Sequence, residues 1–198
     1  MYNKKQSANT YIRTLCSTGF SALTISFYKT NLTFRFIPYI GKGKNGLDDY
    51  NRNSFLSTSI NYERAALFMA IAMGIIDGRD ADKEIEAVYP CLNGTTLFFE
   101  YKPDQNNQMN AYLVINKNNE TIPFRFSTHQ VQIKDNGQIV TKVIQSGLGN
   151  FAMILEAYLQ GVGADIHLNK LGDELEKYQL HDQQAFITTE NNNQGYTN

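Results

Sequence analysis

Apolar and polar residues alternate over short stretches along most of this chain, and this pattern predicts a β-rich protein. In the first 60 residues, strands are predicted at residues 9–15, 20–28, 33–37 and 54–58. After residue 80, further strands are predicted at residues 84–89, 95–101, 111–116, 122–126, 130–134 and 139–144. Polar segments rich in Gly, Asn and Pro separate these stretches, as turns do. No internal repeat is evident in the sequence.

Two of the polar segments carry specific predictions. Residues 41–53 contain three glycines and five charged residues, and they predict a long loop. Asp135-Asn136-Gly137 lies between two alternating stretches and is the strongest hairpin signal in the chain.

One long helix is predicted at residues 61–76, between the two series of strands. Asn61 can cap its N-terminus, and Glu63 places a negative charge in its first turn. Its apolar residues lie nearly all round the helix, so we expect it to be buried on more than one side. Gly78 follows its end.

The C-terminal part of the chain is predicted to be helical and then disordered. Helices are predicted at residues 151–160 and 171–180. Residues 183–198 are polar and have little to bury. The sequence therefore predicts one α+β domain over residues 1–182, followed by a disordered tail.

Composition limits the functions that this chain can have. The net charge is −1 and no basic stripe is present, which argues against a nucleic-acid partner bound by phosphate neutralisation. The two cysteines and three histidines are scattered, so we expect no metal site. Cys16 and Cys91 are either two reduced thiols or one disulfide of an exported protein.

The N-terminus is basic but is not followed by the apolar stretch of a signal peptide. The longest apolar run, residues 65–76, is too short to span a bilayer. We therefore expect a soluble protein with no membrane partner. It is either cytoplasmic, exported without a cleaved signal, or already trimmed of one.

The most informative motif is Ser57-Thr58-Ser59, which ends a predicted strand immediately before the long helix. The motif is expected to place three side-chain oxygens beside the positive end of that helix, a position suited to an anionic or hydroxyl-rich ligand. A second pattern, Phe124-Arg125-Phe126, could stack on bases, but the same alternation is routine in half-buried strands.

The segment around Ser57, Thr58 and Ser59 resembles the central motif of the mono-ADP-ribosyltransferases, nearest in layout to the pertussis and cholera toxin branch. The resemblance covers residues 9–145 in element order. It implies a split β-sandwich around an NAD cleft, with C-terminal helices. NAD would be the substrate, held by Arg13 and the Ser-Thr-Ser motif, with Arg35 as the alternative arginine.

The acidic positions depart from that family's pattern. The family carries Glu-x-Glu on a late strand, and the matching positions here are Gln130 and Gln132, which keep the size of Glu without its charge. Three explanations are open: engineered inactivation, a natural non-catalytic relative, or a misplaced motif. The alternative Glu-x-Glu is Glu84 and Glu86, which leaves too little chain for the intervening strand.

The resemblance implies mono-ADP-ribosylation of a protein target by a secreted or translocated bacterial toxin or effector. The alternative is a catalytically dead relative that acts as a binding or interaction module. A third hypothesis is a β-rich interaction domain whose Ser-Thr-Ser is accidental. That hypothesis predicts that Arg13 and Ser57 are not neighbours.

Overall fold

A computed structural model describes residues 12–28 and 31–161 of the chain. The predicted helix at 171–180, the tail from 183 and the start of the first predicted strand lie outside the described residues. The described part contains both α-helices and antiparallel β-sheets, which confirms the α+β class. Within it, no helix is both long enough and apolar enough to cross a membrane.

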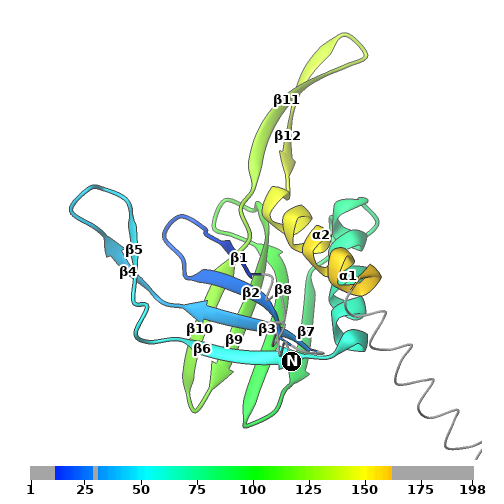
Figure 1. The fold of residues 1–198 in the computed structure, drawn as a ribbon. Helices are drawn as coiled ribbons and strands as arrows, with labels where there is room; N and C mark the ends of the chain where they lie inside the picture. Colours follow the sequence, from blue (N-terminus) through cyan, green and yellow to red (C-terminus); the bar gives the residue numbers. More distant parts are fainter. Residues whose placement is uncertain (1–11, 29–30, 162–198) are drawn as a thin grey trace, which may run out of the picture.

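The first sheet has four antiparallel strands in the order β1-β2-β3-β6. Their bounds are β1 (Ile12–Leu15), β2 (Ala22–Tyr28), β3 (Asn31–Ile37) and β6 (Leu56–Ile60). A hairpin of β4 (Tyr39–Lys42) and β5 (Asp48–Tyr50) is inserted between β3 and β6 and extends away from the sheet (Figure 1). The prediction of an uninterrupted loop over residues 41–53 was therefore wrong, because short strands flank its Gly-rich turn.

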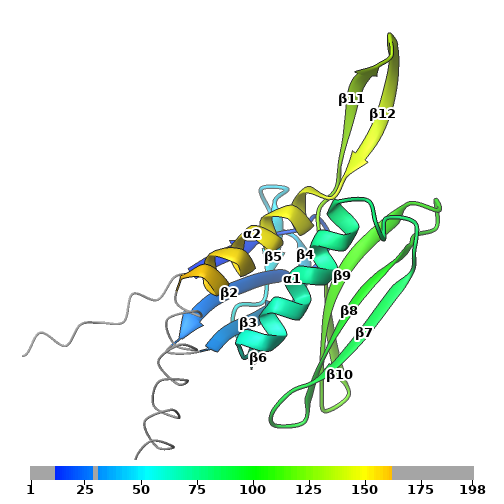
Figure 2. The same ribbon diagram turned by 90° about the vertical axis from the view of Figure 1, so that its right-hand side faces the viewer.

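The second sheet is also a four-stranded antiparallel meander, in the order β10-β9-β8-β7. Its strands are β7 (Ile85–Pro90), β8 (Thr95–Pro103), β9 (Met109–Lys117) and β10 (Glu120–Arg125). A second hairpin, β11 (His129–Asp135) and β12 (Gln138–Ile144), follows β10 and projects far from the body (Figures 1 and 2). Gly137 has a φ of +85° in its turn, as the hairpin signal predicted.

A helix follows the strands of each half. Helix α1 spans Tyr62–Ile76, and the Asn61 side chain accepts a hydrogen bond of 3.1 Å from the backbone N–H of Arg64, so the predicted N-cap is confirmed. Helix α2 spans Ser146–Gln160. Within the described residues, each half thus contains four meander strands, one hairpin and one helix. This repeat is in the topology and not in the sequence.

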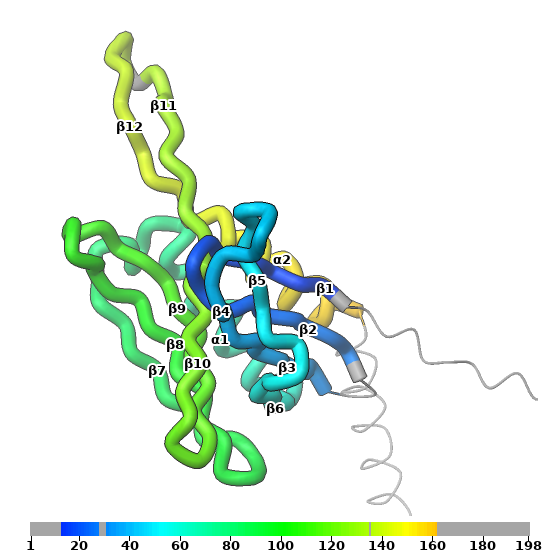
Figure 3. Tube along the Cα trace, turned by 90° about the vertical axis from the view of Figure 1, so that its left-hand side faces the viewer, coloured from blue at the N-terminus to red at the C-terminus, as the bar shows by residue number. Residues whose placement is uncertain are grey.

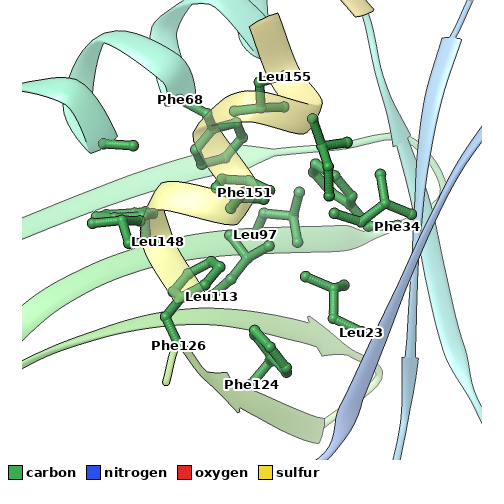
Figure 4. Packing of buried hydrophobic residues seen from close by; sticks show 14 of the residues in the cluster. Leu23, Phe34, Phe68, Leu97, Leu113, Phe124, Phe126, Leu148, Phe151 and Leu155 are labelled. Atoms are coloured by element: carbon green, nitrogen blue, oxygen red, sulfur yellow. The ribbon is translucent and has the colours of Figure 1, made fainter. Parts of the chain in front are cut away.

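The core lies between the inner faces of the two sheets and the helix pair (Figure 4). Phe68 of α1 lies 6.4 Å from Phe34 of the first sheet and 6.3 Å from Phe99 of the second, measured between ring centroids. Phe151 of α2 likewise contacts Phe34 at 5.9 Å and Phe126 at 5.0 Å. Both helices therefore join the two sheets. Because the helices pack on the inner side of the sheets, the outer faces of the sheets lie on the opposite side from the helices (Figure 3).

Helix α2 begins five residues before its predicted start, because Gly147 and Gly149 read as a loop in the sequence. A Cβ at Gly147 would lie 2.4 Å from the backbone nitrogen of Ser127, so the helix approaches the chain closely there. The Gly147 N–H donates to the carbonyl of Ser127 at 2.8 Å. The glycine is thus required by packing.

Candidate functional site

The residues of the Ser-Thr-Ser motif do not form one cluster. They lie within β6, so the two-residue period sends Ser57 and Ser59 to the outer face while Thr58, 8% exposed, faces the core. The Ser59 hydroxyl hydrogen-bonds with that of Thr33 at 2.8 Å. Asn61 caps the helix that follows. The prediction that three oxygens gather at the helix N-terminus was therefore wrong.

The structure separates Arg13 from Ser57. Arg13 lies on the edge strand β1 opposite Ile25, and its side chain lines a small cavity beside α2. Ser57 lies on the other edge strand, β6, and faces the opposite side of the sheet. The alternative arginine, Arg35, lies directly opposite Ser57 on the outer face.

The expected acidic positions are distant from both arginines in the fold. Gln130 and Gln132 lie on β11 in the projecting hairpin, opposite Val143 and Thr141. Their side chains are exposed. The described residues therefore do not bring these glutamines to the Ser-Thr-Ser motif.

The alternative acids do not complete the expected arrangement either. Glu84 precedes β7, and Glu86 lies on β7, the outer edge strand of the second sheet, opposite Glu100. Neither residue is on a strand of the sheet that carries Ser57.

Metal and disulfide chemistry have no site in the described part of the chain. No group of three or more His, Cys, Asp or Glu side chains converges in residues 12–28 and 31–161. Cys16 and Cys91 are free thiols, so the disulfide alternative is not formed here.

The outer face of the second sheet presents aromatic and apolar side chains to solvent. One row across the strands consists of Glu86, Glu100, Tyr112 and Arg125. The neighbouring row consists of Val88, Phe98, Val114 and Pro123. Phe98 and Tyr112 are half-buried and Val88 is exposed. We call the surface formed by Phe20, Phe98, Tyr112, Lys102 and Arg125 the aromatic face.

Phe20 reaches the aromatic face from the turn between β1 and β2. Its ring centroid lies 6.2 Å from that of Tyr112, and the guanidinium carbon of Arg125 lies 4.6 Å from the Phe20 centroid. The buried Ser21 hydroxyl donates to the carbonyl oxygen of Pro123, which ties this turn to β10. The ring is therefore held in place by both sheets.

Lys102 is the second cation on the aromatic face. The ammonium nitrogen of Lys102 lies 5.7 Å from the Tyr112 ring centroid and 2.5 Å from a carboxylate oxygen of Glu100. The hydrogen bond with Glu100 raises the pKa of Lys102, so the lysine is charged at neutral pH. Both cations thus accompany aromatic rings, as in cation–π pairs.

A groove of about 350 Å³ continues the aromatic face toward the first sheet. Phe20 lines one side and Tyr39 of the β4–β5 hairpin lines another, with Pro123 of β10 between the sheets. The Tyr39 ring lies 6.1 Å from that of Tyr50. A series of aromatic rings therefore runs from the second sheet to the first hairpin.

The β4–β5 hairpin is fixed to this groove by Asp48. The Asp48 carboxylate accepts a hydrogen bond of 3.2 Å from the N–H of Gly19 and forms an ion pair with Lys42. The hydrogen bond with Lys42 holds the pKa of Asp48 below its usual value. Burial, with the neighbouring Cys16 and Asp48, raises the pKa of Tyr50 to about 12.

Sequence reasoning could not find this surface. The pattern around Arg125 signalled alternation, and the structure buries Phe124 and Phe126 while Arg125 faces outward. Phe20 and Tyr112 are separated by nearly half of the chain, so no local motif joins them. No protein-family model, curated protein or solved structure matches this chain.

Proposed function

We propose that this chain binds single-stranded nucleic acid by stacking bases on its aromatic face. The observation that carries the proposal is the arrangement around Phe20, whose ring lies beside Tyr112 and under Arg125. In one common class of RNA-binding module, aromatic side chains on the exposed face of a four-stranded sheet stack two or three bases of a single strand in this way. The groove between Phe20 and Tyr39 extends the path to a second aromatic pair.

The charge of the chain fits stacking better than phosphate neutralisation. The sequence argued against a nucleic-acid partner because no basic stripe is present, and that argument covers binding dominated by phosphate contacts. Base stacking on an aromatic side chain contributes about 1–3 kcal/mol per base, separately from any phosphate contact. Arg125 supplies positive charge beside the Phe20 ring, while the charge of Lys102 is balanced by its ion pair with Glu100. The proposal therefore revises the earlier expectation on partners.

The same geometry favours a single strand over a duplex. The bases of a duplex are stacked on one another, so they cannot lie on Phe20 or Tyr112 without being unpaired. Fluorescence anisotropy with a labelled thymidine oligonucleotide and with a duplex of the same length tests this. We expect the single strand to bind at least about tenfold more tightly. Equal affinity for both, or no binding of the single strand, would reject the proposal.

Binding of NAD on the first sheet is a second candidate, with Arg35 in place of Arg13. Arg35 lies opposite Ser57, its guanidinium carbon is 4.4 Å from the Phe55 ring centroid, and the Thr33–Ser59 hydroxyl pair is in the next row. This observation supports a polar, hydroxyl-rich surface with one fixed cation. The mono-ADP-ribosyltransferase hypothesis requires such a site, whereas its non-catalytic alternative predicts a partner interface and no NAD affinity.

Calorimetric titration with NAD distinguishes this candidate from the first. Binding by the unaltered chain that is lost in Arg35→Gln and kept in Arg13→Gln would support it. Absence of any heat of binding with NAD would reject the enzyme hypothesis and leave its non-catalytic alternative, whatever the result with nucleic acid.

A further inference from the structure

The hairpin formed by β11 and β12 is an apolar ribbon with little to pack against among the described residues. Cross-strand partners share a face, so Val131, Ile133, Val140 and Ile144 lie together on one side of it. Apart from the half-buried Val131, these side chains are exposed. A two-stranded hairpin is marginally stable on its own, so this ribbon needs a surface to cover it.

The helix pair carries an apolar groove on the side opposite the aromatic face. Two adjoining cavities of about 690 and 420 Å³ share Ile76, Ser146 and Gly149. Methionines of both helices line the second cavity: Met69, Met73 and Met153. Met153 is 68% exposed. Methionine side chains adapt to irregular apolar partners, which suits a docking surface.

Only the base of the hairpin reaches the groove of its own chain, where Val143 and Ile144 line the first cavity. The hairpin leaves the body beside the start of α2 and points away from the helices (Figure 2). Seven residues in each strand give it a reach of about 20 Å. The projecting part of the hairpin is therefore long enough to reach into the apolar groove of another molecule.

The charges of the two surfaces are complementary. The hairpin has two lysines, Lys134 and Lys142, and one acidic residue, Asp135. Glu156 lines the groove, and residues 77–86, which follow α1 beside it, hold five acidic and two basic residues. The positive charge of the hairpin and the negative charge beside the groove attract each other. The positive charge on each hairpin also keeps two hairpins apart.

We propose that the chain self-associates by seating the β11–β12 hairpin of one copy in the α1–α2 groove of another. The contact joins two different surfaces, so it is made twice around a two-fold axis, repeated around a ring, or repeated along an open filament. The proposal is independent of the nucleic-acid proposal, because the aromatic face takes no part in it.

Mixing two defective variants tests the contact directly. Ile133→Thr/Val140→Thr removes apolar surface from the hairpin while keeping β-forming residues, and Met153→Lys places a positive charge in the groove. By sedimentation velocity on the full chain, we expect each variant alone to associate at least about tenfold more weakly than the unaltered chain. Circular dichroism checks that each variant is folded.

An equimolar mixture of the two variants retains one intact hairpin and one intact groove. We expect it to form one-to-one heterodimers, which a hairpin-to-hairpin contact would not allow. A concentration-independent monomer for the unaltered chain would overturn the proposal and would point to residues 162–198 as cover for the groove. Assembly of the unaltered chain without rescue in the mixture would also overturn it.

Discussion

The guanidinium carbon of Arg125 lies 4.6 Å from the ring centroid of Phe20, and this contact joins the edge strand of the second sheet to the first turn of the first sheet. Arg125 over the ring and Tyr112 with its centroid 6.2 Å away hold the Phe20 ring in place, and the ring is only half-buried. A fixed, accessible ring loses little conformational freedom when a base stacks on it.

Replacing the ring at Phe20 should weaken single-strand binding. Phe20→Leu keeps an apolar side chain and removes the stacking surface, so we expect affinity for a thymidine oligonucleotide to fall about tenfold. Fluorescence anisotropy measures the change. Phe55→Leu is the matched control, since Phe55 is exposed on the first sheet beside Arg35. An equal loss in both variants would contradict a site at the aromatic face.

Arg125 should contribute to the salt dependence of binding. Arg125→Gln removes one cation from the face, so we expect the slope of log affinity against log salt concentration to shrink by about 0.7 if the guanidinium contacts a phosphate. Arg79→Gln is the control, because Arg79 lies in the segment after α1 and pairs with Asp77. A change of slope in the control alone would place the binding site elsewhere.

The two glycines at the start of α2 should respond in opposite directions to alanine. Gly147→Ala puts a methyl group against the backbone of Ser127, so we expect the free energy of unfolding to fall by about 1–3 kcal/mol. At Gly149 nothing lies within 4 Å of the added Cβ. Alanine there should raise the free energy of unfolding by up to about 1 kcal/mol, because alanine has the higher helix propensity. Urea denaturation of both variants measures the difference. Equal changes would contradict the close approach at Gly147.

Tyr50 should make the fold sensitive to alkaline pH. Its pKa is about 12 in the folded chain and about 10 in an unfolded one, so the folded state holds the phenolic proton more tightly. The associated stability is complete below pH 10 and is lost as the pH rises through 12. After solvent screening, we expect the free energy of unfolding to fall by about 1 kcal/mol across this pH range, and urea denaturation measures the change.

The comparison for that titration is Tyr50→Phe, which cannot ionise at this position. Its unfolding free energy should fall less steeply above pH 10 than that of the unaltered chain. Because burial also raises the pKa of Tyr89, Tyr101 and Tyr158, some alkaline destabilisation remains in both. Identical pH profiles would contradict the raised pKa of Tyr50.

Much of the secondary structure could be predicted from the sequence, because it depends on local signals. The N-cap at Asn61, the turn at Gly137 and the period-two strands are all local, and all are found in the structure. The start of α2 could not be predicted, since Gly147 is explained by a contact with Ser127 twenty residues earlier.

The candidate site could not be predicted because it depends on which faces and which distant segments meet. The two-residue period places Thr58 in the core and its neighbours Ser57 and Ser59 outside, which divides a motif that is continuous in sequence. Conversely, Phe20 and Tyr112 have no sequence relationship and lie together only because the two sheets pack at that edge. Ring contacts of this kind follow from tertiary packing alone.

The central claim is that a single strand stacks on Phe20 and Tyr112, and photocrosslinking tests it most directly. An oligonucleotide carrying 5-iodouracil is irradiated with the full chain, and the modified residues are identified by mass spectrometry. The account predicts adducts at Phe20, Tyr112 or Tyr39 that an excess of unlabelled single strand suppresses. Adducts confined to the helix groove or the β11–β12 hairpin, or no suppressible adduct at all, would contradict it.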